Sequence, residues 1–288
     1  MRRKRRMQRR GIQMKKFLAM GLAVVLSGLL LVGCGSSGTA GDQTEPGTET
    51  GNENQGAVQE KLVMGLDDTF APMGFRDDNG ELVGFDIDLA RKVAERLGTE
   101  VELKPIEWAA KEVELNTKKI DMIWNALTIT EERKKEILFT EPYMSNRQVI
   151  VVKADSDIQT KADLAGKVVG TQEGSSSIDA MAAEPEVYNT FKDNLVTYPE
   201  YVTALNDLSV GRTDAMVGDE VVCRYYMSKK PGEYRVLDED FGDEDYGVGF
   251  RLSDTELRDQ VQKALDELKA EGVFGELSIK WFGEDIFQ

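Results

Sequence analysis

A repeated alternation of short apolar runs with amphipathic helical patterns is the feature of this sequence that most restricts its fold. In the first half, strands are expected at 61–65, 81–85, 101–105 and 120–124. Helices are expected after them, at 86–97, 109–118 and 131–137. Strands that alternate with helices predict a mostly parallel sheet and therefore an α/β fold.

The alternation restarts near residue 148. Strands are expected at 148–153, 167–170, 213–218 and 246–250, and helices at 177–183, 201–210, 220–227 and 254–271. The segments 119–125 and 212–218 echo each other, because each follows a helix and contains an apolar strand that opens with Asp. This weak echo fits two similar α/β lobes with a cleft between them.

The first 33 residues have the composition of an export signal. Positions 2–16 hold nine Lys and Arg and no acid, and an apolar run at 17–32 follows them. That run is short for a membrane span, which needs ~20 apolar residues. The residues Leu31-Val32-Gly33-Cys34 resemble the lipobox of bacterial lipoproteins, which implies that Cys34 becomes the lipidated first residue of the mature protein. The alternative is an ordinary signal peptide that contains a cysteine.

Residues 34–60 are expected to form the lipidated Cys and a disordered tether. The segment is rich in Gly, Ser, Thr, Glu, Asn and Gln and has no aromatic residue, so it cannot bury enough apolar surface to fold. A flexible chain of this length spans roughly 25–30 Å. It would hold the folded body near the membrane.

The charge of the chain excludes some partners. Without the first 33 residues, 27 Lys and Arg stand against 52 Asp and Glu, a net charge of −25. Nucleic-acid binding depends on positive side chains that contact phosphates, so no nucleic-acid partner is expected. The same charge argues against a basic patch that docks on anionic lipid.

The cysteine and histidine content limits the chemistry. Cys34 is assigned to the lipid, so Cys223 has no partner for a disulfide within the chain and is expected to be a small buried residue. The sequence has no His, which removes Ser-His-Asp and Cys-His catalysis and His-ligated metals. No cofactor and no metal are expected.

Several motifs from residue 61 onwards occur in the order found in one protein family. They are Gly65-Leu-Asp-Asp-Thr-Phe-Ala-Pro-Met-Gly-Phe75, Val83-Gly-Phe-Asp-Ile-Asp-Leu-Ala90, the segment 119–135, Phe139-Thr-Glu-Pro-Tyr143, Gly170-Thr-Gln-Glu-Gly-Ser175, the segment 214–220 and Gly247-Val-Gly-Phe-Arg251. By these motifs the chain resembles the bacterial extracellular solute-binding proteins of family 3, the polar-amino-acid-binding lipoproteins of ABC importers. The resemblance covers almost all of 61–288.

This resemblance implies the type II periplasmic-binding-protein-like fold, in which a two-strand hinge joins two α/β lobes and the ligand cleft lies between them. Lobe 1 is expected at 61–147 plus 246–288, and lobe 2 at 148–245. Closure of the lobes around a polar amino acid would produce the form that the importer's permease recognises. The protein is expected to be a monomer on the extracellular face of the cell membrane, held there by its lipid.

An amino acid presents an α-carboxylate, an α-ammonium and a side chain. Arg133 is expected at about the third residue of a helix that begins at Thr130, where a cation opposes the helix dipole unless an anion shares the site. An Arg fork with free backbone N–H groups suits a carboxylate. The resemblance assigns this role to Arg133, with Thr128 beside it. An exposed Arg paired with Glu132 or Glu136 is the alternative.

The loop Gly174-Ser175-Ser176-Ser177 lies between an expected strand and helix, and its amides would close over the same carboxylate. Without the resemblance, such a loop is equally an ordinary helix cap. Asp219 follows the expected strand 213–218, where ligand sites of α/β folds collect. By resemblance Asp219 binds the α-ammonium with help from Asn125, although an Asp there otherwise caps a helix.

The ligand side chain is left open. Phe70 and Trp108 match the aromatic walls of the family, although by composition both would be core residues. Asp67 and Glu107 favour a basic or amide amino acid.

Asn125 and Ala126 stand where small or hydroxylated residues are common in the family, and Trp124 just before them is bulkier than usual. Ser177 replaces a larger polar residue of some relatives. The resemblance therefore leaves the ligand side chain open.

Two other classes of function stay open. An enzyme on the same fold, such as a dehydratase, needs a poised acid or base, and Glu107, Glu173 and Glu220 are the candidates. A ligand-sensing ectodomain would carry a membrane helix or a signalling domain after the binding lobes, and we expect neither.

Overall fold

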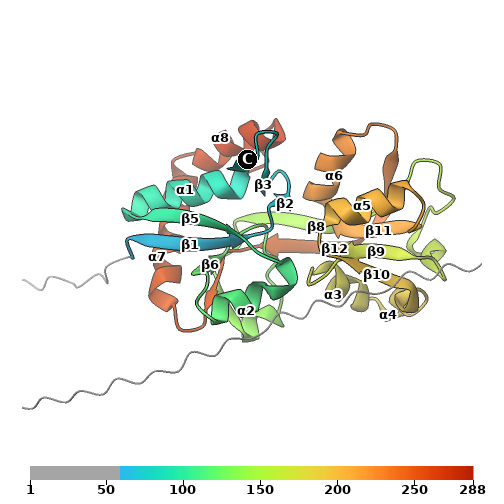
Figure 1. Ribbon diagram of the computed structural model, residues 1–288, viewed down its shortest axis with the longest axis horizontal. Coiled ribbons are helices and arrows are strands. Elements are labelled where there is room, and N and C mark those ends of the chain that lie inside the picture. The colour runs from blue at the N-terminus through green and yellow to red at the C-terminus, as the bar shows by residue number, and fades with distance from the viewer. Residues whose placement is uncertain (1–58, 288) are drawn as a thin grey trace, which may run out of the picture. The chain divides into compact units, whose positions relative to one another are not determined.

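The computed structural model describes residues 59–287, which form two five-stranded sheets, one small sheet and the helices that cover them (Figure 1). The predicted α/β class is confirmed. These residues lie within one compact unit. The expected signal segment 1–33, Cys34 and the tether up to residue 58 lie outside the described residues. No helix in the described part of the chain is long and apolar enough to cross a membrane.

The first large sheet has the strand order β5-β1-β6-β13-β7. Its strands are β1 (Lys61–Leu66), β5 (Glu100–Pro105), β6 (Met122–Ile123), β7 (Ile137–Phe139) and β13 (Gly249–Arg251). β1 pairs in parallel with β5 and β6, whereas β13 inserts antiparallel between β6 and β7. We call the part of the chain built on this sheet the first lobe.

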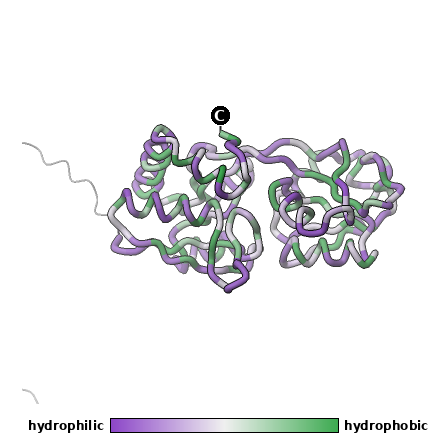
Figure 2. Tube along the Cα trace, turned by 90° about the horizontal axis from the view of Figure 1, so that it is seen from above, coloured by the Kyte–Doolittle hydropathy of each residue, from purple (hydrophilic) through white to green (hydrophobic). Residues whose placement is uncertain are grey.

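The helices of the first lobe are α1 (Phe85–Leu97), η1 (Trp108–Ala110), α2 (Lys111–Asn116), η2 (Arg133–Lys135), α7 (Thr255–Ala270) and α8 (Val273–Phe282). A small antiparallel sheet joins β2 (Thr69–Phe70), β3 (Gly74–Arg76) and β4 (Leu82–Val83). Helix α1 buries Ile87, Ala90 and Val93 against the core and exposes its polar face. Figure 2, which is coloured by hydropathy, shows hydrophilic and hydrophobic residues alternating along the helices in the same way.

The second large sheet has the order β10-β9-β11-β8-β12 and forms what we call the second lobe. Its strands are β8 (Met144–Lys153), β9 (Val169–Gln172), β10 (Leu195–Tyr198), β11 (Ala215–Asp219) and β12 (Tyr234–Tyr246). Its helices are η3 (Lys161–Leu164), α3 (Ser177–Ala182), α4 (Pro185–Tyr188), η4 (Lys192–Asn194), α5 (Tyr201–Ser209) and α6 (Glu220–Ser228). β9 is parallel to β10 and β11, and β8 is antiparallel to β11 and β12.

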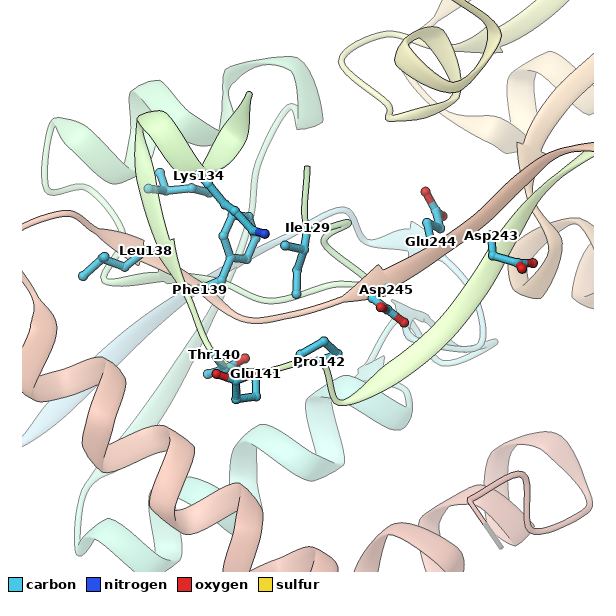
Figure 3. A pocket seen from close by; sticks show the side chains of 11 residues that line it. Ile129, Lys134, Leu138, Phe139, Thr140, Glu141, Pro142, Asp243, Glu244 and Asp245 are labelled. Atoms are coloured by element: carbon cyan, nitrogen blue, oxygen red, sulfur yellow. The ribbon is translucent and has the colours of Figure 1, made fainter. Parts of the chain in front are cut away.

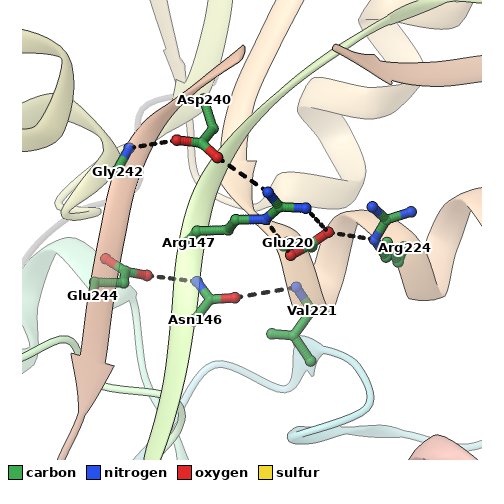
Figure 4. A network of polar contacts seen from close by, with 8 residues as sticks. All are labelled: Asn146, Arg147, Glu220, Val221, Arg224, Asp240, Gly242 and Glu244. Atoms are coloured by element: carbon green, nitrogen blue, oxygen red, sulfur yellow. Dashed lines mark hydrogen bonds and ion pairs between the residues drawn. The ribbon is translucent and has the colours of Figure 1, made fainter. Parts of the chain in front are cut away.

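The chain passes between the two lobes along the antiparallel strands β8 and β12, which pair over most of their length. Figure 4 shows the polar contacts that tie them together. Asn146 Nδ2 donates to Glu244 at 2.6 Å, and Arg147 contacts Asp240 at 3.2 Å. Arg147 also binds Glu220 at the start of α6. The connection between the lobes is thus cross-linked to the helix that follows β11.

One helical prediction is wrong. The segment 131–137, expected as a helix, contains only the single turn η2 and then enters strand β7. Residues 131–136 are all charged, so a helix there would have no apolar face to bury. Ile137 and Phe139 are buried instead through the pairing of β7 with β13.

Several elements were not expected from the sequence, and the two longest of them are β12 and α8. The acidic stretch before Tyr246 belongs to the long strand β12, and α8 follows Gly272, whose φ of 84° ends α7. Charged residues on β12 are tolerated because many of them remain exposed.

Candidate functional site

Residues of both lobes enclose a cavity of about 10 Å³. Its walls are formed by Phe70, Trp108, Ala126, Thr128, Arg133, Gln172, Ser175, Ser176, Tyr201 and Asp219. Gln172 and Asp219 end the strands β9 and β11, where ligand sites of α/β folds usually form. The cavity has room for about one water molecule. An amino acid can enter only after the lobes or the lining side chains move apart.

Most of the predicted site residues line this cavity, but Asp67, Asn125 and Ser177 do not. Asn125 Oδ1 accepts a hydrogen bond from the backbone N–H of Asp67 at 3.0 Å, and the Asn125 side chain packs against Gly74. Ser177 lies behind Ser175, and their hydroxyls are 2.9 Å apart. These side chains support the cavity walls from behind.

Gln172 and Tyr201 line the cavity but were not identified from the sequence, and Ser176, which also lines it, was expected only as part of the loop 174–177. Gln172 and Ser176 lie in or beside the motif 170–175, so this motif was the available signal. Tyr201 starts α5 in a segment that carries no motif. Its hydroxyl lies 2.6 Å from that of Ser175, a contact that only the folded chain brings about.

Arg133 donates hydrogen bonds to two backbone carbonyls, one in each lobe. Its Nη1 donates to Thr128 O at 2.8 Å and its Nη2 donates to Gly174 O at 3.1 Å, and the side chain is 10% exposed. The argument from the helix dipole does not apply, because the N–H of Arg133 is capped by Thr130 Oγ1 on a single turn. A guanidinium has five N–H donors. Donors beyond these two are therefore available for an anion.

The alternative for Arg133, an exposed ion pair with its neighbours, does not describe the structure. Glu132 pairs with Lys135 at 2.5 Å. The acid nearest to Arg133 is Glu112, at 3.8 Å from Nε.

Asp219 is a buried carboxylate surrounded by neutral donors. Its Oδ1 accepts from Gln148 Nε2 at 2.5 Å and from the Tyr201 hydroxyl at 3.3 Å, and its Oδ2 accepts from the Tyr246 hydroxyl at 2.8 Å. Burial, and then the charge of Glu244, raise the pKa of Asp219 to about 8. No Lys or Arg among residues 59–287 forms an ion pair with Asp219. A cation that enters the cavity would therefore be the first to pair with this carboxylate.

The serine loop, residues 174–177, belongs to the second lobe and forms hydrogen bonds with the first lobe beside the cavity. Ser176 Oγ lies 2.9 Å from Thr128 Oγ1 in the first lobe and donates to Glu244 at 2.9 Å. Ser177 Oγ donates to Gln148 Oε1 at 2.6 Å. The loop hydroxyls thus belong to one network with Asp219.

Aromatic side chains close the cavity from both lobes. The rings of Phe70 and Tyr201 meet edge to face, with centroids 5.8 Å apart. Trp108 lines both this cavity and a neighbouring hollow of about 260 Å³. That hollow is lined by Asp67, Asp68, Pro105, Ile106, Glu107, Trp108, Pro199 and Glu200.

Two buried polar atoms beside the cavity have no hydrogen-bond partner among the described residues. They are Gln172 Oε1 and Asn125 Nδ2. Buried polar groups are nearly always hydrogen-bonded. Asn125 Nδ2 lies against Gly74, whereas Gln172 lines the cavity. The Gln172 oxygen and the unused donors of Arg133 therefore make the cavity suitable for a small polar molecule.

A second, larger hollow of about 660 Å³ lies where β7 approaches β12 (Figure 3). Its walls are Ile129, Lys134, Ile137, Leu138, Phe139, Thr140, Glu141, Pro142, Asp243, Glu244 and Asp245. None of the predicted site residues lines it, and the cation among its walls, Lys134, already bonds to Glu131 at 2.7 Å. Size alone therefore does not mark the functional site.

Comparison with known proteins shows the family of this chain. A model of the bacterial extracellular solute-binding proteins, family 3, matches residues 62–284. The L-cystine-binding protein TcyJ of Escherichia coli K12 is 34% identical over 227 residues, which are 78% of this chain and 84% of that protein. The histidine-binding periplasmic protein of Salmonella typhimurium is 35% identical over 239 residues, or 80% of this chain and 91% of that protein.

A solved structure of a substrate-binding protein shows that the fold is similar as well. The substrate-binding protein of an ABC uptake transporter from Streptococcus pneumoniae, with bound histidine, superposes with a TM-score of 0.76 at 39% identity. The match covers 79% of this chain and 94% of that chain. These relatives are binding proteins rather than enzymes, and so is this chain. It belongs to the bacterial extracellular solute-binding proteins, family 3.

Proposed function

We propose that this chain captures a polar α-amino acid between its two lobes outside the cell and delivers it to an ABC permease. One observation carries the proposal. A single cavity is lined by Arg133, a cation 10% exposed with unused donors, and by Asp219, a buried carboxylate that forms no ion pair with residues 59–287. An α-amino acid is the small molecule that supplies both missing charges.

In this proposal each end of the ligand has its own partners. Arg133, Thr128 and the loop at Ser175 hold the α-carboxylate, because an Arg fork and neighbouring N–H and O–H donors match its two oxygens. Asp219 accepts the α-ammonium. The side chain of the ligand packs against Phe70, Trp108 and Ala126. The residues behind these walls, which support them, are Asp67, Asn125 and Ser177.

Closure then follows from a difference in affinity. Arg133 belongs to the first lobe and Asp219 to the second, so a ligand that bonds to both stabilises the closed form relative to the open form. The lobes proposed for this movement are 61–147 plus 246–288, and 148–245. The strands β8 and β12 serve as the hinge.

The side chain of the ligand is proposed to be basic. The hollow beside Trp108 contains the carboxylates of Asp67, Asp68, Glu107 and Glu200. The pKa of Glu200 is raised by burial and by the charges of these other acids. A cationic side chain would relieve this repulsion, whereas an amide side chain would only add hydrogen bonds.

The chain is further proposed to act as a monomeric lipoprotein on the extracellular face of the cell membrane. Cys34, within the lipobox-like sequence, is the proposed lipidation site. The tether 34–60 would let the folded body rotate towards the permease.

The test is thermal unfolding of the mature chain in the presence of each of the twenty amino acids. A ligand at ~100 times its Kd adds ~2.7 kcal/mol to the stability of the folded state. A rise in Tm with basic amino acids is expected, and it should disappear in Arg133→Ala and Asp219→Ala. If none of the twenty raises Tm in a folded, ligand-free preparation, the amino-acid function is wrong.

A further inference from the structure

Lys111 is a buried cation that the proposed function leaves unused. It is the first residue of α2, and its side chain is 3% exposed. Lysine is almost never fully buried unless it is paired. Burial, and then the charge of Arg133, lower the pKa of Lys111 to about 8, whereas Glu112 and Asp179 act in the opposite direction. Such a side chain stays in place only if specific contacts offset the loss of water.

The contacts of Lys111 cross from one lobe to the other. Its Nζ donates to Gly174 O in the second lobe at 2.9 Å and to Trp108 O in its own lobe at 3.3 Å. It also lies 3.2 Å from Glu112 Oε1 and 5.0 Å from the centre of the Trp108 ring. Arg133 donates to the same Gly174 carbonyl. Two cations of the first lobe therefore hold one backbone oxygen of the second.

The lobes touch directly at this carbonyl. Gly174 has a φ of 71°, and a Cβ placed on it would lie 2.9 Å from Ala109 Cα. No side chain fits there without movement of the backbone. The next two residues, Ser175 and Ser176, line the cavity. Whatever fixes Gly174 therefore fixes the part of the second lobe that covers the ligand.

We propose that Lys111 is a positioning residue that latches the closed form by its hydrogen bond to the Gly174 carbonyl, and so holds the serine loop over the ligand. The latch rests on the lobe closure proposed above. Opening would break the bond and return the amine to water. Lys111 would therefore mainly lower the dissociation rate of the ligand.

The first test follows the exposure of the amine. Acetylation of Lys111 in the mature chain is measured by mass spectrometry, without ligand and with saturating L-arginine. The side chains of Lys119 and Lys135, 56% and 65% exposed, are internal references. L-arginine is expected to slow acetylation of Lys111 by about tenfold or more and to leave the references unchanged. Equal acetylation of Lys111 with and without bound L-arginine would overturn the latch.

A variant that prevents the contact keeps this test independent of the ligand. Gly174→Val should make Lys111 react faster than in the wild type saturated with L-arginine, because the valine side chain would meet Ala109. If no amino acid binds the wild type, the proposed function fails. The contact between Lys111 and Gly174 then has to form without a ligand, so the comparison of ligand-free wild type with Gly174→Val decides the latch, which is rejected if Lys111 reacts equally fast in both.

The second test separates the latch from a purely structural role. Lys111→Met keeps the length of the side chain but removes the donor, and it is expected to raise the dissociation rate of L-arginine about tenfold while the association rate stays the same, as for the loss of one charge-assisted hydrogen bond. Lys92→Met, the same change at a 51% exposed side chain on α1, should alter neither rate. An unchanged dissociation rate in Lys111→Met would contradict the proposal.

Discussion

The carboxylate of Asp86 accepts a hydrogen bond from the backbone N–H of Ala126 at 2.7 Å, and this bond fixes a wall of the cavity. Ala126 has a φ of 52°, which is uncommon for a residue with a side chain. The same carboxylate oxygen accepts the Tyr143 hydroxyl at 2.9 Å, next to the start of β8. Asp86 is fully buried at the start of α1, so one carboxylate connects helix, cavity and hinge.

Removal of this carboxylate should destabilise the fold. In Asp86→Ala the Ala126 N–H and the Tyr143 hydroxyl lose their acceptor, and each unsatisfied buried group costs about 1–3 kcal/mol. We expect the free energy of unfolding in urea to fall by about 3 kcal/mol or more. Asp86→Asn, which keeps an acceptor oxygen, should lose less. Equal losses in the two variants would show that the hydrogen bonds are not the cause.

The stability should depend on pH through the same residue. Burial raises the pKa of Asp86 from 3.8 to about 7. Between these values the folded state keeps the proton and the unfolded state loses it, so the free energy of unfolding falls as pH rises from about 4 to 7. Asp86→Asn has no such proton. Urea unfolding at several pH values should therefore show a shallower decline in the variant, and parallel profiles would refute this cause.

Ligand binding should release protons from Asp219. Its pKa of about 8 in the absence of a cation means that much of it is protonated at pH 6.5. An α-ammonium beside it favours the charged form and lowers the pKa. Calorimetric titrations with L-arginine at pH 6.5, in buffers of different ionisation enthalpy, should report this release. Asp219→Asn should abolish it and weaken binding by about 2–5 kcal/mol, while Asp155→Asn, at an 81% exposed side chain, should change neither.

A pair of glycines separates backbone strain from contact between the lobes. Gly174 and Gly166 have φ values of 71° and 72°, but a Cβ at Gly166 would meet nothing within 4 Å. Gly→Ala at either position should cost about 1–2 kcal/mol of stability through the left-handed backbone. Only Gly174→Ala should also weaken binding of L-arginine, because its Cβ would push against Ala109. Similar affinities in the two variants would argue against close contact of the lobes at Gly174.

Local patterns in the sequence were enough to predict the α/β class. The apolar face of α1 follows from the spacing of apolar residues along the chain. The alternation of strands and helices follows from the same spacing. Most of the lining residues of the cavity were also predicted, because Arg133, Asp219 and their neighbours lie in motifs that occur in a fixed order.

Only the tertiary structure decided how these pieces meet. Periodicity within the sequence does not report a contact such as that between Asp67 and Gln172, whose side chains lie 2.7 Å apart across 105 positions of the chain. For the same reason Tyr201 was not predicted to line the cavity. The turn at Arg133 was predicted to be a helix, whereas the residues that follow it form strand β7, which pairs with β13. The burial of Lys111 against Gly174 likewise results from the approach of two lobes, and no pattern within either lobe contains it.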